Sequence, residues 1–178
     1  FAGESVSTLG TGLSVARQGL AGAANSGTAA YFAGGYSTVA PTRWDTIDKF
    51  AFSDDSRTTL GTGLTAGVSQ PAGAANSGTA AYFAGGYDGS GRVTTVDKFA
   101  FPGDSRSTLG TGLSAANNNL TGGAESGVAG YFGGGYTAAG AVTTIDKFAF
   151  SDDSRTTLGT GLSVALYSLG CAANSGVL

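Results

Sequence analysis

The stretch that decides the fold is TLGTGL at residues 8–13. The same six letters return at residues 59–64, 108–113 and 157–162, at intervals of 51, 49 and 49 residues. A period in this range indicates one supersecondary unit that buries its apolar faces only by stacking on its copies. The sequence therefore predicts a repeat architecture for the whole chain.

Two other strings repeat in the same register. YFAGGY occupies residues 31–36 and 82–87 and returns as YFGGGY at 131–136, and DKFAF occupies residues 48–52, 97–101 and 146–150. Turn signals divide one period into four candidate strands, at residues 19–24, 28–36, 46–52 and 57–64. No window has the apolar spacing of a helix. Four short strands in about fifty residues are typical of a propeller blade.

The fold class that we predict is all-β, a β-propeller with four-stranded antiparallel blades. Residues 29–33 are apolar on both faces, as in sheets that stack face to face. A sandwich or barrel of up to fourteen strands is the alternative, but it would not require identical units. We expect three full blades and two partial ones, with approximate bounds 1–14, 15–65, 66–114, 115–163 and 164–178.

The repeated unit resembles the kelch repeat. The resemblance rests on a diglycine that closes the second strand, as at Gly34-Gly35, and on an aromatic residue in the third strand, as at Phe50. Kelch units usually place a tryptophan early in the fourth strand, whereas this chain has arginine there, at positions 57, 106 and 155. The string GYFGGG at 130–135 is also similar to glycine-rich repeats in virion structural proteins of cyanobacterial phages. This resemblance implies a virion or extracellular location.

Composition excludes several classes of function. The 178 residues include 32 glycines, no histidine and one cysteine, Cys171, and the net charge is −3. Nucleic-acid binding requires a basic surface, and without histidine most zinc and copper sites and serine or cysteine catalytic triads are excluded. The chain contains no run of 18 or more apolar residues, which a membrane-spanning helix would require. We therefore expect no cofactor, no metal and no catalytic centre.

Ionisable residues mostly recur in step with the repeat. Asp48-Lys49 and its copies fit either a ring of functional charges or a structural ion pair, and we favour the latter. The turn after the third strand carries Glu4, Asp55, Asp104 and Asp153 at equivalent positions, with Asp54 and Asp152 beside two of them. These acids fit turn formation, a calcium site or acid–base catalysis, and we favour turn formation, with the arginines at 57, 106 and 155 neutralising them. The tyrosines after the diglycine, Tyr36, Tyr87 and Tyr136, fit sugar stacking or turn packing equally well.

The segments that differ between units should project from one face. The loops between the second and third strands and the crossovers between units vary in sequence, whereas the other two turns are nearly constant. Variable loops on a rigid frame commonly carry recognition. We therefore predict that this face binds a glycan or a protein. The candidate ligand-binding residues are Arg17, Arg43, Trp44, Asp88, Arg92, Asn117, Asn118, Asn119 and Tyr167.

The function predicted from these features is a non-catalytic binding or structural module. One alternative is the non-catalytic part of a larger carbohydrate-active enzyme, and another is an engineered repeat protein. Because the pattern stops mid-blade at both ends, we expect further polypeptide to complete the terminal blades. It would come from the same gene product or from a homo-oligomer partner.

Overall fold

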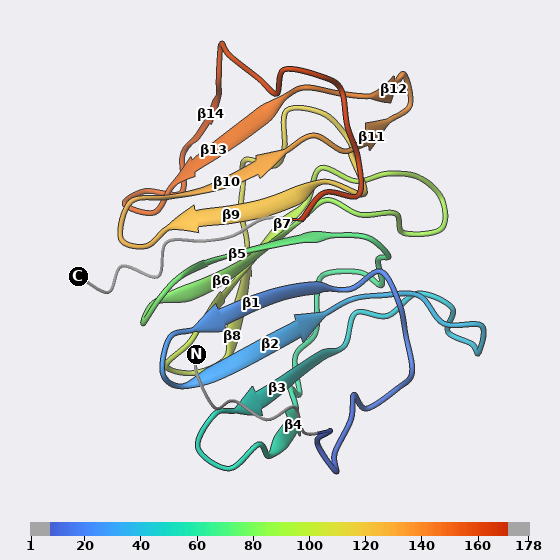
Figure 1. Cartoon of the computed structure of the whole chain (residues 1–178), viewed down its shortest axis with the longest axis vertical. Helices are drawn as coiled ribbons and strands as arrows, with labels where there is room; N and C mark the ends of the chain where they lie inside the picture. The colour runs from blue at the N-terminus through green and yellow to red at the C-terminus, as the bar shows by residue number, and fades with distance from the viewer. Residues whose placement is uncertain (1–7, 171–178) are drawn as a thin grey trace.

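Three four-stranded antiparallel sheets follow one another along the chain (Figure 1). The computed structural model describes residues 8–170, and this part of the chain contains strands and no helix. The first sheet has the order β1 (Ala21–Asn25), β2 (Ala29–Ala33), β3 (Ile47–Ala51) and β4 (Arg57–Thr59). The predicted all-β class is confirmed.

The second and third sheets repeat this meander. The second contains β5 (Ala72–Asn76), β6 (Ala80–Ala84), β7 (Val96–Ala100) and β8 (Ser105–Thr108). The third contains β9 (Thr121–Glu125), β10 (Ala129–Gly133), β13 (Ile145–Ala149) and β14 (Arg155–Thr157). A small hairpin of β11 (Tyr136–Thr137) and β12 (Gly140–Ala141) extends its middle loop. Each sheet lies within one predicted repeat, and no helix in the described residues could span a membrane.

The strands are shorter than the sequence predicts. The second strand ends at Ala33 because Gly34 and Gly35 adopt positive φ angles of 70° and 111° and turn the chain out of the sheet. The fourth strand ends at Thr59, and the rest of the predicted segment enters the crossover to the next sheet. The backbone amides of Leu60 and Leu64 still bond back to Ile47 and Asp45 of the same unit.

Apolar side chains join neighbouring sheets face to face. Tyr31 of the first sheet packs on Phe101 of the second with ring centroids 5.1 Å apart, and Tyr82 packs on Phe150 of the third at 5.0 Å. Both tyrosines are almost fully buried. Because the middle sheet has a neighbour on each side, all five residues of β6 are buried, which explains why this strand lacks the alternation of a half-exposed one.

Glycine lets the first strands of the sheets approach each other closely. A Cβ atom on Gly73 would overlap the carbonyl oxygen of Gly22, and one on Gly122 would overlap that of Gly73. β1, β5 and β9 accordingly lie side by side through the middle of the molecule, while β4 and β14 lie at opposite ends (Figure 1). The three sheets do not close a ring within residues 8–170.

Candidate functional site

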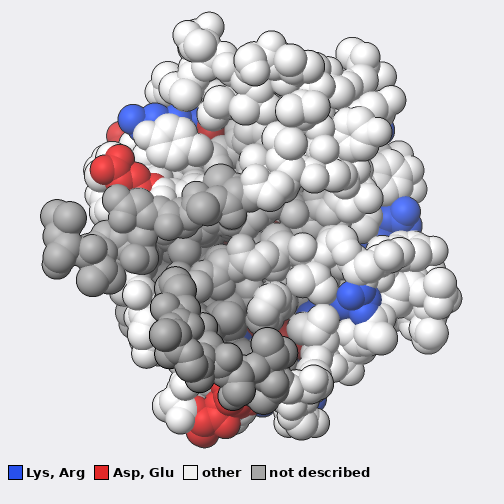
Figure 2. Space-filling view, in the orientation of Figure 1, with Lys and Arg blue, Asp and Glu red and all other residues white. Residues whose placement is uncertain are grey.

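The variable loops and the crossovers lie on one side of the molecule, as predicted. Short antiparallel bridges join each crossover to the loop of its own unit, pairing Gln18 with Tyr36, Ser69 with Tyr87 and Asn118 with Tyr136. We call this side the loop face; it lies to the right in Figure 1, around β11 and β12. On that edge of the largely uncharged surface, the visible charged groups are mainly basic (Figure 2).

A ladder of backbone hydrogen bonds ties the crossovers together. The amide of Gln70 donates to the Gly19 carbonyl at 2.6 Å, Asn119 donates to Gln70 at 3.1 Å, and Ser168 donates to Asn119 at 2.8 Å. All four residues have φ angles between 55° and 62°, a left-handed conformation that costs energy in residues other than glycine. Since the ladder overcomes this cost, the backbone beneath the loop face is preorganised.

Tyrosine and arginine side chains alternate across the loop face. The Arg43 guanidinium carbon lies 5.7 Å from the ring centre of Tyr36 and 4.8 Å from that of Tyr87, and Arg92 lies 4.9 Å from Tyr136. Tyr136 in turn packs edge-on against Tyr167 at 5.5 Å. Each arginine therefore makes a cation–π contact with the next unit. This tyrosine–arginine band joins the predicted residues Arg43, Arg92 and Tyr167.

A polar groove opens in the band between the first and second units. It has a volume of about 360 Å³, and its lining includes the side chains of Gln18, Tyr36, Arg43, Ser69, Gln70 and Tyr87. One unit further on, Asn118 takes the place of Ser69 and fills the equivalent position. Its side chain donates to Gln70 at 2.7 Å and accepts from Arg92 Nε at 2.9 Å. The smaller serine therefore leaves the groove open.

Arg43 and Arg92 differ in how their donors are used. Within the described residues, Arg43 Nε is buried and has no hydrogen-bond partner, whereas Arg92 Nε is bound to Asn118. The exposed Asp88 caps its own turn by accepting from the amides of Gly91 and Ser90, and these bonds lower its pKa, with a smaller effect from Arg43. Arg43 thus makes no ion pair with the described residues, and its recorded side-chain contacts are with the two tyrosine rings.

Two other predicted ligand residues serve the interior instead. The side chain of Arg17 is fully buried and binds Asp48 at 2.6 Å. Asn117 is buried and donates to the carbonyl of Gly134 at 2.7 Å. Both side chains are buried and bind the interior, so we do not include them in the candidate site.

The remaining predicted residues frame the band. The Trp44 indole donates to the Ser37 hydroxyl at 2.9 Å, which fixes the loop beside Arg43. Asn119 contributes its backbone to the ladder, and Tyr167 is exposed at the end of the band. Sequence reasoning did not select Gln18, Ser69 and Gln70 as ligand residues, because their contribution depends on contacts between units 51 residues apart. The only available signal was that the crossovers differ in sequence.

The repeated Asp-Lys motif does not form the expected ion pair. Adjacent strand residues point to opposite faces, so Asp48 binds Arg17, and Lys49 reaches Asp104 of the next sheet at 2.8 Å. Burial opposes the ionisation of Asp48, but hydrogen bonds from Ser14 and Thr59, together with Arg17, outweigh it and lower its pKa. The motif is structural, but Asp48, Lys49 and Lys98 pair with residues outside it.

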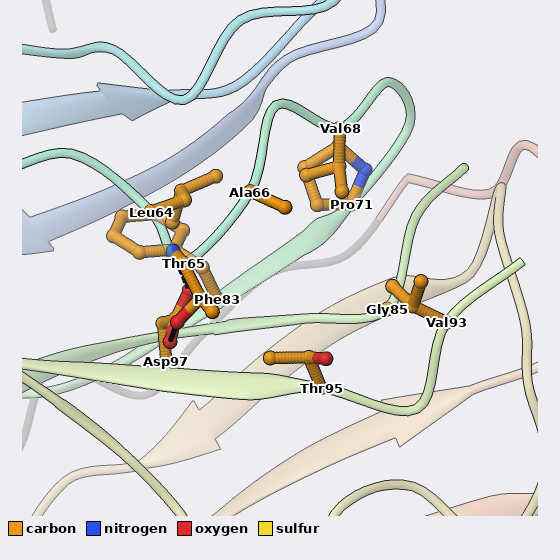
Figure 3. A pocket seen from close by; sticks show the side chains of 10 residues that line it. All are labelled: Leu64, Thr65, Ala66, Val68, Pro71, Phe83, Gly85, Val93, Thr95 and Asp97. Atoms are coloured by element: carbon orange, nitrogen blue, oxygen red, sulfur yellow. Dashed lines mark hydrogen bonds between the residues drawn. The ribbon is translucent and has the colours of Figure 1, made fainter. Parts of the chain in front are cut away.

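The equivalent aspartates anchor the crossovers between sheets. Asp97 accepts from the backbone amide and the hydroxyl of Thr65, as Figure 3 shows, and Asp146 accepts both bonds from Ser114. The space between this crossover and the second sheet is a cavity of only about 30 Å³, enough for a water molecule. These carboxylates therefore hold the frame and do not line a ligand site.

The acidic turns are also tied to neighbouring sheets. Asp104 accepts from Tyr31 at 2.9 Å and from Lys49, and Asp153 accepts from Tyr82 at 2.7 Å and from Lys98. Burial, followed by the bond to Asp104, raises the pKa of Tyr31. The expectation that the nearby arginines neutralise these acids is wrong. They donate instead to glycine carbonyls in the TLGTGL string of the preceding unit, as Arg106 does to Gly63 at 2.9 Å.

Turn formation is confirmed for two acids. Asp54 and Asp152 accept from the amides of Ser56 and Ser154, two residues on, and these bonds lower their pKa values.

Residues 8–170 contain no cluster of three or more potential metal ligands. Glu4 and Cys171 lie outside the described residues. No protein-family model and no curated protein matches the chain.

Proposed function

We propose that the chain is a non-catalytic binding module, built from consecutive blades of a β-propeller, that contacts a glycan or a partner protein through its loop face. The observation that carries this proposal is the polar groove, in which Arg43 lies between two tyrosines and has no ion-pair partner among the described residues. A location on a virion or another extracellular surface is part of the proposal and rests on the sequence resemblance alone.

The packing of the sheets supports a propeller. The same contacts join the first sheet to the second and the second to the third, and the first strands approach one another through glycine. In a propeller, blades fan out around their inner strands and the ring closes after several units. The sheets at its two ends therefore each have a face that a further unit would cover.

The exposed face of the first sheet has the residues that such a contact uses. Phe52 is 49% exposed, whereas its equivalents Phe101 and Phe150 are 6% and 9% exposed under a neighbouring tyrosine. A hollow of about 560 Å³ borders Phe32, Phe52 and the glycines of the first strands. We propose that further blades, from the same gene product or from another copy, cover this face.

The positions of the acidic residues support a non-catalytic role. The aspartates of the third strands bind crossover residues, and Asp104 and Asp153 bind tyrosine and lysine of the adjacent sheet. Each of these carboxylates already has a structural partner. The polar donors that could bind a ligand lie instead in the groove, where binding would not require a catalysed reaction.

Two binding measurements test the loop face. One measures binding of the chain to an array of neutral and acidic oligosaccharides, and the other uses a surface-display library to capture a partner protein. The variant Arg43→Ala with Tyr167→Ala changes this face. Asp54→Ala with Asp152→Ala, on two turns of the opposite side, is the matched control. We expect only the first pair to weaken binding. If only the second pair does so, the proposed face is wrong.

A further inference from the structure

The environment of Arg43 indicates which chemical group the groove recognises. Its guanidinium carbon lies near the ring centres of both Tyr36 and Tyr87. The cation therefore lies between two aromatic rings, and its N–H donors form no ion pair within the described residues. A guanidinium edge matches the two oxygens of a carboxylate.

The rest of the lining resembles a sugar site more than a protein-binding site. Gln18, Ser69 and Gln70 supply amide and hydroxyl groups that can bond to sugar hydroxyls, and the two tyrosines supply aromatic surface. Arg43 is the only charged residue in the lining. The groove also lacks the large apolar pocket that anchors a protein hot spot, and its volume is within the range of small-molecule sites.

The acidic groups near Arg43 leave its edge available. Asp88 is a carboxylate whose pKa Arg43 helps to lower, and its oxygen Oδ1 accepts hydrogen bonds from the amides of Ser90 and Gly91. No ion pair forms between Arg43 and an acidic residue within the described part of the chain. An incoming carboxylate can therefore compete for the arginine.

We infer that the groove between Tyr36 and Tyr87 binds a carboxylated sugar, such as a uronate or a sialate, with the carboxylate held by Arg43. This inference rests on the proposed function and specifies its ligand class. The equivalent place between the second and third units should not bind such a sugar. There Asn118 occupies the space and already accepts from Arg92.

Calorimetric titration of the full chain with acidic oligosaccharides tests the inference. The probes are oligogalacturonate, a glucuronate-terminated and a sialate-terminated oligosaccharide, each compared with its methyl ester, which keeps the sugar but removes the charge. At least one acid should bind about 10-fold to 100-fold more tightly than its ester, as expected for charge-assisted hydrogen bonds. Arg43→Gln should abolish this preference, and the matched variant Arg92→Gln should retain it.

Three outcomes would overturn the inference. These are equal binding of acid and ester, an unchanged preference in Arg43→Gln, and binding of oligoglutamate as tight as that of the best sugar, which would indicate an acidic protein ligand. Circular dichroism of each variant checks that the fold is kept, and Arg43→Lys provides a second, milder variant. If no acidic sugar binds but the loop-face pair still weakens another interaction, the inference fails and the proposed function stands. If the loop-face pair changes nothing, both fail.

Discussion

At the scale of single residues, the buried ion pair of Arg17 and Asp48 has no equivalent in the second and third units. Asp48 accepts from Ser14, Arg17 and Thr59, whereas Asp97 and Asp146 are satisfied by hydroxyl and amide donors alone. Val68 and Asn117 occupy the positions equivalent to Arg17. The first unit therefore carries an additional charge whose burial depends on Asp48.

Replacing Asp48 with asparagine should destabilise the protein strongly. Removing one partner leaves Arg17 buried without a counter-charge, which costs about 3 kcal/mol or more. Urea denaturation at pH 7 measures the change. Asp54→Asn is the matched control, because Asp54 is an exposed turn residue and asparagine also forms such turns. Equal losses in the two variants would contradict the structural role of the pair.

The same substitution should change the response to acid. The pKa of Asp48 is lower in the folded protein than in the unfolded chain, so its ionised form stabilises the fold above a pH of about 4. This contribution is lost as the pH falls through the folded pKa. The free energy of unfolding should therefore fall less steeply below pH 4 in Asp48→Asn than in the unaltered protein. Parallel pH profiles would show that Asp48 contributes nothing to acid sensitivity.

At the scale of the elements, glycine in the first strands sets the distance between sheets. Gly73 and Gly122 face the backbone of the preceding first strand, whereas a Cβ atom on Gly22 would have no atom within 4 Å. The three glycines hold equivalent positions in β1, β5 and β9. Only the two that face another strand should require the absence of a side chain.

Gly73→Ala should lower the free energy of unfolding by about 2 kcal/mol or more. Its Cβ atom would overlap a carbonyl oxygen, which is backbone and cannot rotate away, and overpacking of this kind typically costs about 1–3 kcal/mol. Gly22→Ala in the same strand position should be nearly neutral. Thermal and chemical denaturation compare the two proteins. A larger loss in Gly22→Ala would mean that β1 also faces a closely packed neighbour.

At the scale of the whole molecule, the stack has a covered middle and two terminal faces. The middle sheet is packed on both sides, while the first sheet leaves Phe52 half exposed. On the other terminal sheet, Tyr131 and Lys147 have no acidic partner among the described residues, although the equivalent tyrosines and lysines bind Asp104 and Asp153. The two terminal faces therefore lack, among the described residues, the contacts that the inner faces have.

Phenylalanine-to-alanine substitutions should show this difference. Phe101→Ala removes a ring buried against Tyr31 and should cost about 3–4 kcal/mol. Phe52→Ala, at the equivalent position of the first sheet, should cost less than about 1 kcal/mol. Denaturation of both variants at micromolar concentration, with sedimentation to record their mass, provides the comparison. Equal costs would show that Phe52 is already covered in solution.

The sequence by itself determined the local structure. The recurrence of TLGTGL, the diglycine and the turn acids sufficed to predict three four-stranded units without helix and a common side for the variable loops, because turn chemistry and strand patterning are local properties. The strand lengths predicted from the sequence were too long. The glycines at 34 and 35 leave the sheet with positive φ angles, which the sequence pattern does not reveal.

Only the tertiary structure decided how the charged and aromatic residues are partnered. Lys49 meets Asp104, Arg43 meets Tyr87 and Arg17 meets Asp48, and each pair joins residues more than 30 positions apart. Proximity along the chain instead suggested pairing of Asp48 with Lys49 and of the arginines with the turn acids. The physical reason is that a strand directs neighbouring side chains to opposite faces. Charges therefore pair with residues distant in the sequence, within a unit or across two sheets. The stacking of one unit on the next determines which donors remain without an ion-pair partner in the groove.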